Sequence, residues 1–414
     1  MQSSAIPDAT APESRQLIGL PTLMTMAFNN VDLNPTADAL LERIKADPQD
    51  ATALMDMAVI FIMRGNTTLA RSMQTLALQT RQIFHYPRPD VRIKIRALAI
   101  LGPGDLMANS PFEFLTEHQP VALDLLYITP AMFLPQTIPE HDVLIVAIAE
   151  SDANQALLAS LEQALADWPV PVINRPARIS QLSRDTSCAL LASIAGVLMP
   201  GAQRVQRALL EDCCRSQEQA AALSAQLNGI DYPIIIRPID SHAGQGLSKI
   251  VSRDDLALYL INSTEQIFFV SQFIDYRSAD GLFRKYRVIL IDGTPYLCHM
   301  AISQRWMVHY LNADMLESAA HRAEEAACMA SFDTGFAMRH GAALQAIYTT
   351  LGLDYVGLDC AETADGKLLI FEADSNMVVH NMDPADLFPY KKIQMPKIFN
   401  AFTALLAQRC AKQP

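Results

Sequence analysis

Three carboxylates in a segment that otherwise reads as a buried β-hairpin place the strongest constraint on this chain. The apolar run of residues 355–360 contains Asp359, and the run of residues 368–374 contains Glu372 and Asp374. Side chains alternate between the two faces of a strand, so Glu372 and Asp374 point to the same face. Carboxylates that converge among Val, Leu, Ile and Phe repel one another, which predicts a cation between them.

The turn between these runs sets which residues face each other. The dipeptide Asp365-Gly366 is typical of a two-residue hairpin loop. With such a loop Ala364 pairs with Lys367, and counting outward places Asp359 opposite Glu372, with Cβ atoms about 5 Å apart. A longer loop would change this register. Because oxygen ligands favour magnesium, which usually brings substrate phosphates, the hairpin predicts a nucleotide–metal site. The alternative is a solvated hairpin whose acids fan out into water.

A glycine-rich turn upstream predicts a phosphate-binding flap between two β-prone runs, residues 232–236 and 247–251. Glycines let backbone amides approach an anion closely, and neighbouring side chains add donors and positive charge. A strand follows the glycines, so this is neither a Walker loop nor a dinucleotide fingerprint, both of which need a helix there. The alternative is a turn that binds nothing. The candidate phosphate contacts are Arg237, Ser241, His242, Gly244 and Gly246.

A basic strand lies between the flap and the acid-bearing hairpin. Residues 283–291 lead into Asp292-Gly293, which predicts a second tight hairpin. Lys285 and Arg287 share one face of this strand and would suit a triphosphate, although they could also mark an exposed strand end.

Taken in order, the flap, the segment 272–275, the basic strand and the paired acids resemble the ATP-grasp carboxylate–amine ligases. Glutathione synthetase, D-alanine–D-alanine ligase and the ribosomal-protein glutamate ligases belong to this superfamily. The resemblance covers residues 184–406, and the preceding segment more loosely. It implies an α/β chain of the α+β ATP-grasp type, with ATP and Mg²⁺ as cofactors and Mn²⁺ as an alternative metal.

The resemblance also implies roles for individual residues. Asp359, Glu372 and Asp374 would hold magnesium on ATP; the family usually has Asn at the third place, so Asn376 is the other candidate. Arginines stand where the family has lysines that bind phosphate, and Arg287 would lie nearest the transferred phosphoryl group. The implied nucleotide contacts are Arg204, Arg237, Lys285, the backbone of Gln272, Phe273 and Ile274 against adenine, and Asp275 against ribose.

The implied reaction joins a carboxylate to an amine through an acyl phosphate and releases ADP and phosphate. The carboxylate would belong to a small molecule or a peptide, and the amine to a compound such as an amino acid. A kinase on this fold and a non-catalytic nucleotide-binding adaptor are the alternatives. An irregular polar and aromatic stretch, residues 299–312, predicts a substrate lid. The candidate substrate contacts are Arg305, Trp306, His309, Asn376 and His380.

Three domains are predicted along the chain. Residues 1–92 form a helical, tetratricopeptide-like segment with helix from about residue 35 to 84. One such repeat cannot bury both of its faces, so we expect it to dock on the α/β domain or on a second copy in a homodimer. Residues 93–183 alternate strands and helices, which predicts a parallel sheet with substrate contacts at residues 102–104 and 174–175. Residues 184–414 form a two-lobed ATP-grasp domain with the smaller lobe at about 203–274.

Composition excludes several partners. The formal net charge of −12 argues against nucleic acid as a partner. No apolar run approaches the roughly 20 residues of a membrane helix, and the first residues lack the features of a secretory signal. Seven scattered cysteines without CxxC spacing fit reduced thiols, which predicts a cytoplasmic protein.

Overall fold

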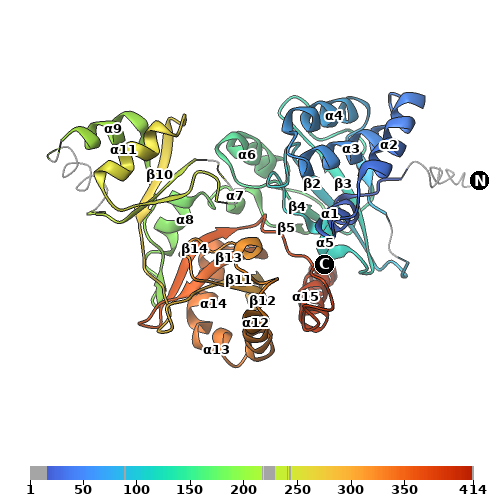
Figure 1. Ribbon diagram of the computed structural model, residues 1–414. Coiled ribbons are helices and arrows are strands. Elements are labelled where there is room, and N and C mark those ends of the chain that lie inside the picture. Colours follow the sequence, from blue (N-terminus) through green and yellow to red (C-terminus); the bar gives the residue numbers. More distant parts are fainter. Residues whose placement is uncertain are drawn as a thin grey trace, which may run out of the picture.

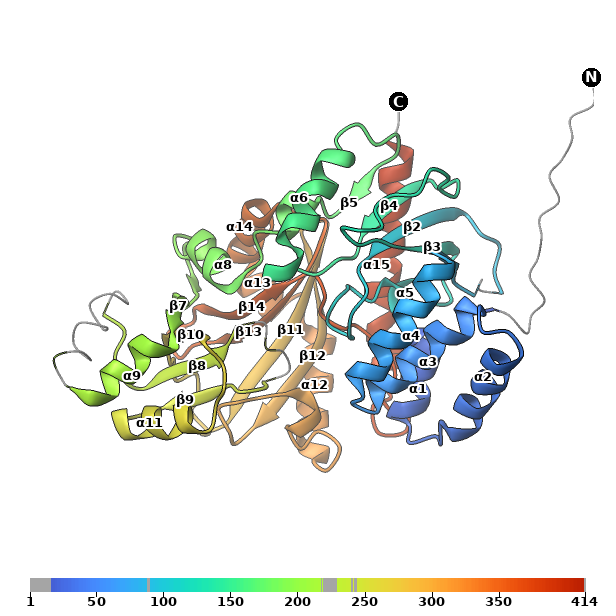
Figure 2. The ribbon, with the colours of Figure 1, turned by 90° about the horizontal axis from the view of Figure 1, so that it is seen from above.

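The computed structural model describes residues 16–87, 90–216, 218, 229–239, 241 and 244–412. It is a mixed α/β structure with three sheets: a first sheet of five strands, a smaller sheet of four strands, and a second five-stranded sheet, which we call the larger sheet. Figures 1 and 2 place the smaller sheet and the N-terminal helices at opposite ends of the molecule, with the larger sheet between them. In the part of the chain that is described, no helix is both long and apolar enough to span a membrane.

Four helices form the N-terminal segment: α1 (Leu20–Phe28), α2 (Asn34–Ala46), α3 (Ala51–Met63) and α4 (Thr67–Thr80). The break between α2 and α3 is set by Asp50, whose carboxylate caps α3 through the Ala53 N–H at 3.1 Å and accepts two hydrogen bonds from Arg43. Helix α3 is buried almost all round, so it must pack on several neighbours at once.

This segment docks on the α/β domain, as expected, because Leu54, Met55 and Leu78 belong to the same buried core as the first sheet. The expected extent of helix is wrong at its end. Residues Ile83–His85 form strand β1, which pairs antiparallel with β3. A short apolar stretch beside an open sheet edge gains ladder hydrogen bonds that a helix could not supply there. The likeness to a tetratricopeptide repeat stays a prediction.

The first sheet is parallel apart from β1 and has the order β1-β3-β2-β4-β5. Its other strands are β2 (Ile95–Leu101), β3 (Val121–Tyr127), β4 (Val143–Val146) and β5 (Val172–Ile173). The expected alternation of strands and helices is present, with α5 (Phe112–Thr116), α6 (Gln155–Ala164) and α7 (Pro176–Ile179). Strands β2 and β4 are apolar at nearly every position because both faces are covered.

The smaller sheet is antiparallel, in the order β7-β10-β8-β9, and two helices pack on it. The strands are β7 (Gln203–Gln206), β8 (Ile234–Pro238), β9 (Ser248–Ile250) and β10 (Ile267–Gln272), and the helices are α9 (Arg207–Arg215) and α11 (Arg253–Ile261). Helix α8 (Arg184–Leu191) precedes this sheet in the chain. The glycine-rich turn joins β8 to β9, so the flap is a hairpin, as expected.

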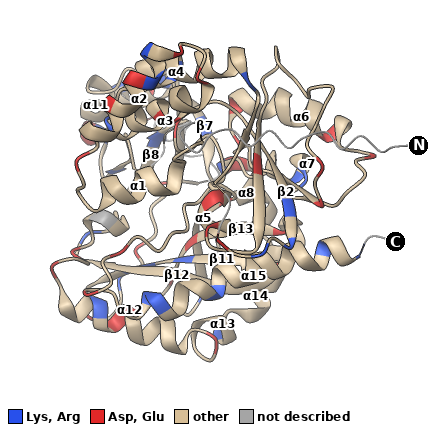
Figure 3. Ribbon diagram, turned by 90° about the vertical axis from the view of Figure 1, so that its right-hand side faces the viewer, with Lys and Arg blue, Asp and Glu red and all other residues tan. Residues whose placement is uncertain are grey.

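The larger sheet has the order β12-β11-β13-β14-β6 and carries the acid-bearing hairpin at its centre. Its strands are β6 (Val197–Leu198), β11 (Phe283–Ile291), β12 (Thr294–Ser303), β13 (Tyr355–Glu362) and β14 (Leu368–Asp374). The remaining helices are α12 (Ala319–Ser331), α13 (Phe336–Arg339), α14 (Gly341–Leu351) and α15 (Lys391–Ala411), and a short 3₁₀ helix (Tyr310–Asn312) follows β12. Both signs of charge occur on the N-terminal helices and on α12 (Figure 3).

The hairpin of β13 and β14 reaches the expected register by an unexpected route. The loop is longer than two residues: Glu362 pairs with Leu368, and the Thr363 N–H donates to the Lys367 carbonyl at 3.0 Å. The expected Ala364–Lys367 pair is therefore wrong. A β-bulge next to Asp359 adds one residue on β14 and restores the count, so Asp359 does pair with Glu372.

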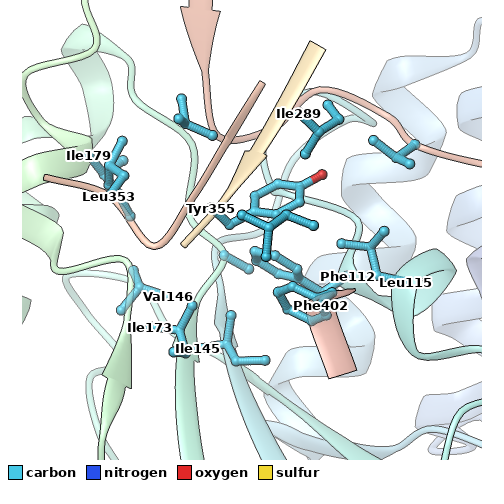
Figure 4. Close-up of a cluster of buried hydrophobic side chains, with 14 of the residues drawn as sticks. Phe112, Leu115, Ile145, Val146, Ile173, Ile179, Ile289, Leu353, Tyr355 and Phe402 are labelled. Atoms are coloured by element: carbon cyan, nitrogen blue, oxygen red, sulfur yellow. The ribbon is translucent and has the colours of Figure 1, made fainter. Parts of the chain in front are cut away.

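An aromatic cluster joins the first sheet to the larger sheet. The rings of Phe112 and Phe402 stack with centroids 5.2 Å apart, and the ring of Tyr355 meets that of Phe112 edge-on at 5.3 Å. Figure 4 shows this cluster continuing into Ile145 and Ile173 of the parallel sheet. These contacts hold β13 at a set position relative to the first domain.

Asn174 reinforces the same joint. Its Nδ2 donates to the Tyr355 carbonyl at 2.8 Å, and its Oδ1 accepts from the Tyr355 N–H at 3.0 Å. Asn174 is fully buried, and the adjacent Arg175 pairs with Glu162. The expectation that residues 174–175 contact substrate is therefore wrong for Asn174, since both ends of its amide are already used to connect two sheets.

Removal of residues before Arg92 is expected to cause aggregation, because it would uncover the apolar face of the first sheet and leave the edge of β3 unpaired. Light scattering and size-exclusion chromatography of the truncated protein check this. A truncated chain that stays monodisperse with unchanged thermal stability would show that the helical segment is an independent module.

The buried Glu113 of α5 is expected to make stability depend on pH. Burial raises the pKa of its carboxyl to about 7, so the stability that it contributes is present at pH 4 and is lost as pH rises through 7. Glu113→Gln should therefore raise the free energy of unfolding at pH 8 by up to about 3 kcal/mol and change it little at pH 4. Urea unfolding at both pH values measures this. Glu42→Gln, at a side chain that is 72% exposed, is the control; an equal effect of Glu113→Gln at both pH values would refute the prediction.

Candidate functional site

Asp359 lies at the centre of the larger sheet with two cationic side chains on it. Lys285 Nζ is 2.6 Å from its Oδ2, and Arg287 Nε is 2.8 Å from its Oδ1. Burial alone would raise the pKa of the Asp359 carboxyl, but Arg287 and Lys285 hold it far below its usual range. Lys285 and Arg287 share one face of β11, as expected, and they are not an exposed strand end.

Glu372, opposite Asp359, has a partner that the sequence reasoning missed. Arg184, the first residue of α8, donates through Nη2 to Glu372 Oε1 and through Nη1 to the Phe371 carbonyl at 3.3 Å. Burial acts to raise the pKa of Glu372, but the charges of Arg184, Arg237 and Lys285 together outweigh it and the pKa is lowered. No local pattern could have revealed this pair, since the two residues are 188 positions apart.

Asp374 and Asn376 extend the acidic end of β14. Burial and the nearby Glu372 raise the pKa of Asp374 to about 7, and its Oδ1 accepts from the Asn376 N–H at 3.3 Å. Asn376 is almost fully buried, and its Nδ2 donates to the Met107 carbonyl at 2.7 Å. Its Oδ1 has no hydrogen-bond partner among the described residues. A buried oxygen without a donor suits a cation.

These oxygen atoms fit a hard divalent cation, but not in the arrangement that the sequence predicted. Both oxygens of Asp359 are already held by Lys285 and Arg287. Within the described ranges no three His, Cys, Asp or Glu side chains converge as a metal-binding group. The donors that remain are Glu372, Asp374 and the Oδ1 of Asn376, a set of oxygens typical of a magnesium site.

A small cavity opens beside this end of β14, between α8, β14 and the smaller sheet. Arg204 stands on its wall, held at 2.6 Å by Asp152 and at 2.8 Å by Asp185, with its guanidinium 5.0 Å from the Phe269 ring centroid. The lining residues are Glu150, Asp152, Leu182, Ser183, Arg184, Ser187, Met199, Arg204, Ser241, Phe269, Glu372, Ala373 and Asp374.

Arg237 and Ser241 lie at the start of the flap, as the phosphate prediction requires. Arg237 Nε donates to Ser241 Oγ at 3.1 Å, and burial together with the charge of Arg184 lowers the pKa of Arg237 to about 10. A bound anion would stabilise the charged form of this buried guanidinium. Gly244 and Gly246 both have positive φ, and the Gly246 carbonyl accepts from the Tyr259 hydroxyl at 2.7 Å. His242, a further predicted phosphate contact, lies outside the described residues.

The segment expected to bind adenine is held by contacts to the start of β8. Gln272 Nε2 donates to the carbonyls of Asp231 and Pro233, both at 2.9 Å. The Phe273 N–H donates to the Pro233 carbonyl at 3.1 Å, so that group already has an acceptor. Ile274 is half-buried.

Charged groups flank this segment. Lys249 Nζ lies 3.6 Å from the centroid of the Phe273 ring. Asp275, the residue proposed for ribose, forms an ion pair with Arg277 at 2.5 Å. The adenine and ribose roles stay predictions.

The predicted lid residues follow β12, the strand that pairs with the basic strand β11. The Trp306 ring meets the Phe273 ring edge-on at 5.8 Å, and its carbonyl accepts from the Tyr276 hydroxyl. Arg305 is exposed. Burial and the nearby charge of Lys285 lower the pKa of His309, which places this imidazole close to the basic strand.

His380 contacts the helical segment. Its ring centroid lies 5.7 Å from that of Phe28 in α1 and 6.4 Å from that of Phe114 in α5. Its Nδ1 accepts from the Met382 N–H at 3.1 Å, and burial lowers its pKa to about 4. These contacts show a neutral packing residue, and the substrate role expected for His380 stays a prediction.

Comparison with known proteins gives structural matches alone: no family model and no curated protein matches the sequence. The chain is similar to a RimK domain ATP-grasp protein from Sphaerobacter thermophilus, with 16% identity and a TM-score of 0.43 over 75% of this chain and 99% of that one. It is also similar to the VanG D-Ala:D-Ser ligase from Enterococcus faecalis, with 13% identity and a TM-score of 0.45 over 76% and 100%. A D-alanine–D-alanine ligase from Bacillus anthracis in complex with ATP matches with 12% identity and a TM-score of 0.43 over 78% and 100%.

Glu372→Gln is expected to weaken divalent-metal binding by about tenfold or more, since a neutral amide is a poorer magnesium ligand than a carboxylate. Sequence reasoning alone expects the metal-free protein to gain stability from lost repulsion. The ion pair of Glu372 with Arg184 reverses that expectation, and we predict that the free energy of unfolding falls by about 1 kcal/mol. Mn²⁺ titration and urea unfolding measure the two effects; unchanged metal affinity would sink the assignment of Glu372.

Gly246→Val is expected to weaken ATP binding about tenfold. A Cβ at this position would lie 2.7 Å from Pro238 Cδ, and φ is +64°, so the flap must shift. Gly244→Val meets only Met307 Sδ at 3.8 Å and should have the smaller effect. Gly281→Val, also at positive φ but with nothing within 4 Å, controls for backbone strain. Calorimetry with ATP and Mg²⁺ checks the order, and equal affinities in all three variants would contradict a phosphate flap here.

Proposed function

We propose that this chain is an ATP-dependent ligase of the ATP-grasp type that joins a carboxylate to an amine through an acyl phosphate. One observation carries the proposal: cationic side chains from three separate elements gather around the acids of a single hairpin. These are Arg184 of α8, Arg237 of β8, and Lys285 and Arg287 of β11. A glycine-rich flap on a second sheet starts at one of them, Arg237.

The charge balance supports binding of a magnesium–triphosphate complex. Excess positive charge beside a partly protonated Asp374 favours an anion and a divalent cation arriving together. Glu372, Asp374 and Asn376 would hold the cation, which supplies charge neutralisation on the phosphates. Arg237 and the flap amides would bind phosphate oxygens. Arg204 lines the same cavity.

Arg287 is the residue we assign to the transferred phosphoryl group. Its guanidinium is oriented by Asp359 through Nε and Nη2, at 2.8 and 3.1 Å, and by the Val378 carbonyl through Nη1 at 3.3 Å. A cation held this firmly can stabilise negative charge without reorganising during the reaction. The γ-phosphoryl group passes to the substrate carboxylate and ADP leaves; the amine then attacks the carbonyl carbon and phosphate leaves. No side-chain nucleophile is required.

The substrates would enter from the side of the predicted lid. Arg305, Trp306 and His309 follow β12 and border the basic strand, where an exposed guanidinium suits a carboxylate. We propose a small-molecule or peptide carboxylate and an amine such as an amino acid. Free cysteines at all seven positions are compatible with a reducing compartment such as the cytoplasm.

Trapping the acyl phosphate tests this function directly. The protein is incubated with MgATP, hydroxylamine and pools of carboxylic acids and peptides, and hydroxamate and ADP are measured; amino acids then replace hydroxylamine and amides are sought by mass spectrometry. Arg287→Gln should lose hydroxamate formation. Arg339→Gln, which removes a guanidinium from Glu362 outside the site, should retain it. A phosphorylated product without hydroxamate or amide would instead identify a kinase.

A further inference from the structure

Arg184 and any metal on Glu372 would compete for the same carboxylate. The guanidinium donates to Glu372 Oε1 and to the carbonyl of Phe371, so it lies against the outer end of β14. Glu372 also lines the cavity beside Asp374, where the metal donors gather. A divalent cation and a guanidinium cannot both lie against one carboxylate oxygen without strong repulsion.

Arg184 is placed so that it can move. Its side chain is 21% exposed, it stands at the first position of α8, and it lines the open cavity. It is also close enough to Arg237 for the two charges to repel, so leaving Glu372 without a new anion would be unfavourable. Phosphate oxygens brought into the cavity would supply that anion, in the bidentate geometry that arginine prefers.

Arg204 on the same cavity is held differently. It is fixed between the carboxylates of Asp152 and Asp185, and neither of these belongs to the metal donor set. Among the described residues, Glu372 is the one carboxylate in an ion pair with Arg184, and under the proposed function this carboxylate would bind the metal when nucleotide is present. The two arginines therefore cannot be interchangeable phosphate contacts.

We propose that Arg184 is an exchangeable counter-ion: it holds Glu372 in the free protein and transfers to a phosphate oxygen when the metal and the nucleotide bind together. The contact then disfavours metal binding without nucleotide and couples the two ligands. This inference rests on the proposed function, because it takes Glu372 as a metal ligand and ATP as the source of phosphate.

Mn²⁺ binding to the nucleotide-free protein, followed by electron paramagnetic resonance, tests the competition. Arg184→Gln removes the charge but keeps a polar side chain, and it should bind Mn²⁺ about tenfold more tightly than the parent. Arg184→Lys retains the charge but lacks the forked guanidinium, and its Mn²⁺ affinity should lie between those of the parent and Arg184→Gln. The double variant Arg184→Gln/Glu372→Gln should lose the gain, and Arg339→Gln should match the parent.

The second measurement is the affinity for ATP in the presence of Mg²⁺, by calorimetry. Arg184→Gln should weaken it by about tenfold, so metal alone and metal–nucleotide respond in opposite directions. A merely structural role for Arg184 would weaken both. The proposal is overturned if Arg184→Gln weakens the binding of both Mn²⁺ and ATP, or if its Mn²⁺ affinity equals that of the parent. Thermal melting of each variant tests whether it is folded. If Arg184→Gln is unfolded, the Mn²⁺ and ATP affinities of Arg184→Lys decide the proposal.

The proposed function and this inference fail in different ways. A parent protein that yields neither hydroxamate nor amide with MgATP refutes the ligase, whatever Mn²⁺ does. A parent that turns over normally while Arg184→Gln leaves Mn²⁺ binding unchanged refutes the exchange alone. Absence of Mn²⁺ binding in every variant, Arg184→Gln included, refutes the exchange as well, since no competition then exists.

Discussion

The balance of buried charge on the hairpin of β13 and β14 governs the arrangement of everything around it. Asp359 is 3% exposed in its side chain, and an isolated carboxylate there would be too costly to keep ionised. Lys285 and Arg287 on the neighbouring strand compensate it, and Arg184 compensates Glu372 from a different element. Asp374 has no comparable ion pair within the described part of the chain, and burial together with the nearby Glu372 raises its pKa to about 7. The free protein thus neutralises two of its acids with its own cations.

The scaffold holds this charged end in place from two directions. The aromatic cluster of Phe112, Tyr355 and Phe402, with Asn174, fixes the start of β13 against the parallel sheet. At the same end of the hairpin, just beyond β14, Asn376 donates to the Met107 carbonyl in the loop after β2. The first domain therefore contributes to the geometry of the proposed metal donors although none of the acids belongs to it.

The helical segment takes part in the same support. Gln74 of α4 donates to the Gly104 carbonyl at 2.7 Å in the loop that also contains Met107, and Phe28 of α1 packs on His380 beyond the acids. Segments far apart in the sequence therefore meet at these two contacts. The segment docks on its own chain because one apolar face packs on the first sheet, while a second cluster of apolar residues is buried among its own helices.

Sequence reasoning reached the site through patterns that are local. The alternation along β14, the glycines of the flap, the shared face of Lys285 and Arg287 and the parallel strands of the first domain are all set by neighbours within a few residues. The Asp359–Glu372 pairing was predicted correctly from a loop that is one residue too short, because the β-bulge compensates. A β-bulge depends on the packing of the whole sheet, so a rule for two-residue turns does not predict its position.

The amino-acid sequence by itself determined the flap, the basic strand, the acid-bearing hairpin and the identity of the acids and cations, since these follow from residue type and short-range periodicity. Tertiary structure decided which charges meet. Arg184 reaches Glu372 across 188 positions, Asn174 bridges to Tyr355 across 181, and Asn376 finds Met107 across 269. Such pairings depend on how the sheets are stacked, and a long-range contact leaves no periodic trace in the chain. For that reason the sequence alone could not show that Asp359 is held by Lys285 and Arg287 and Glu372 by Arg184.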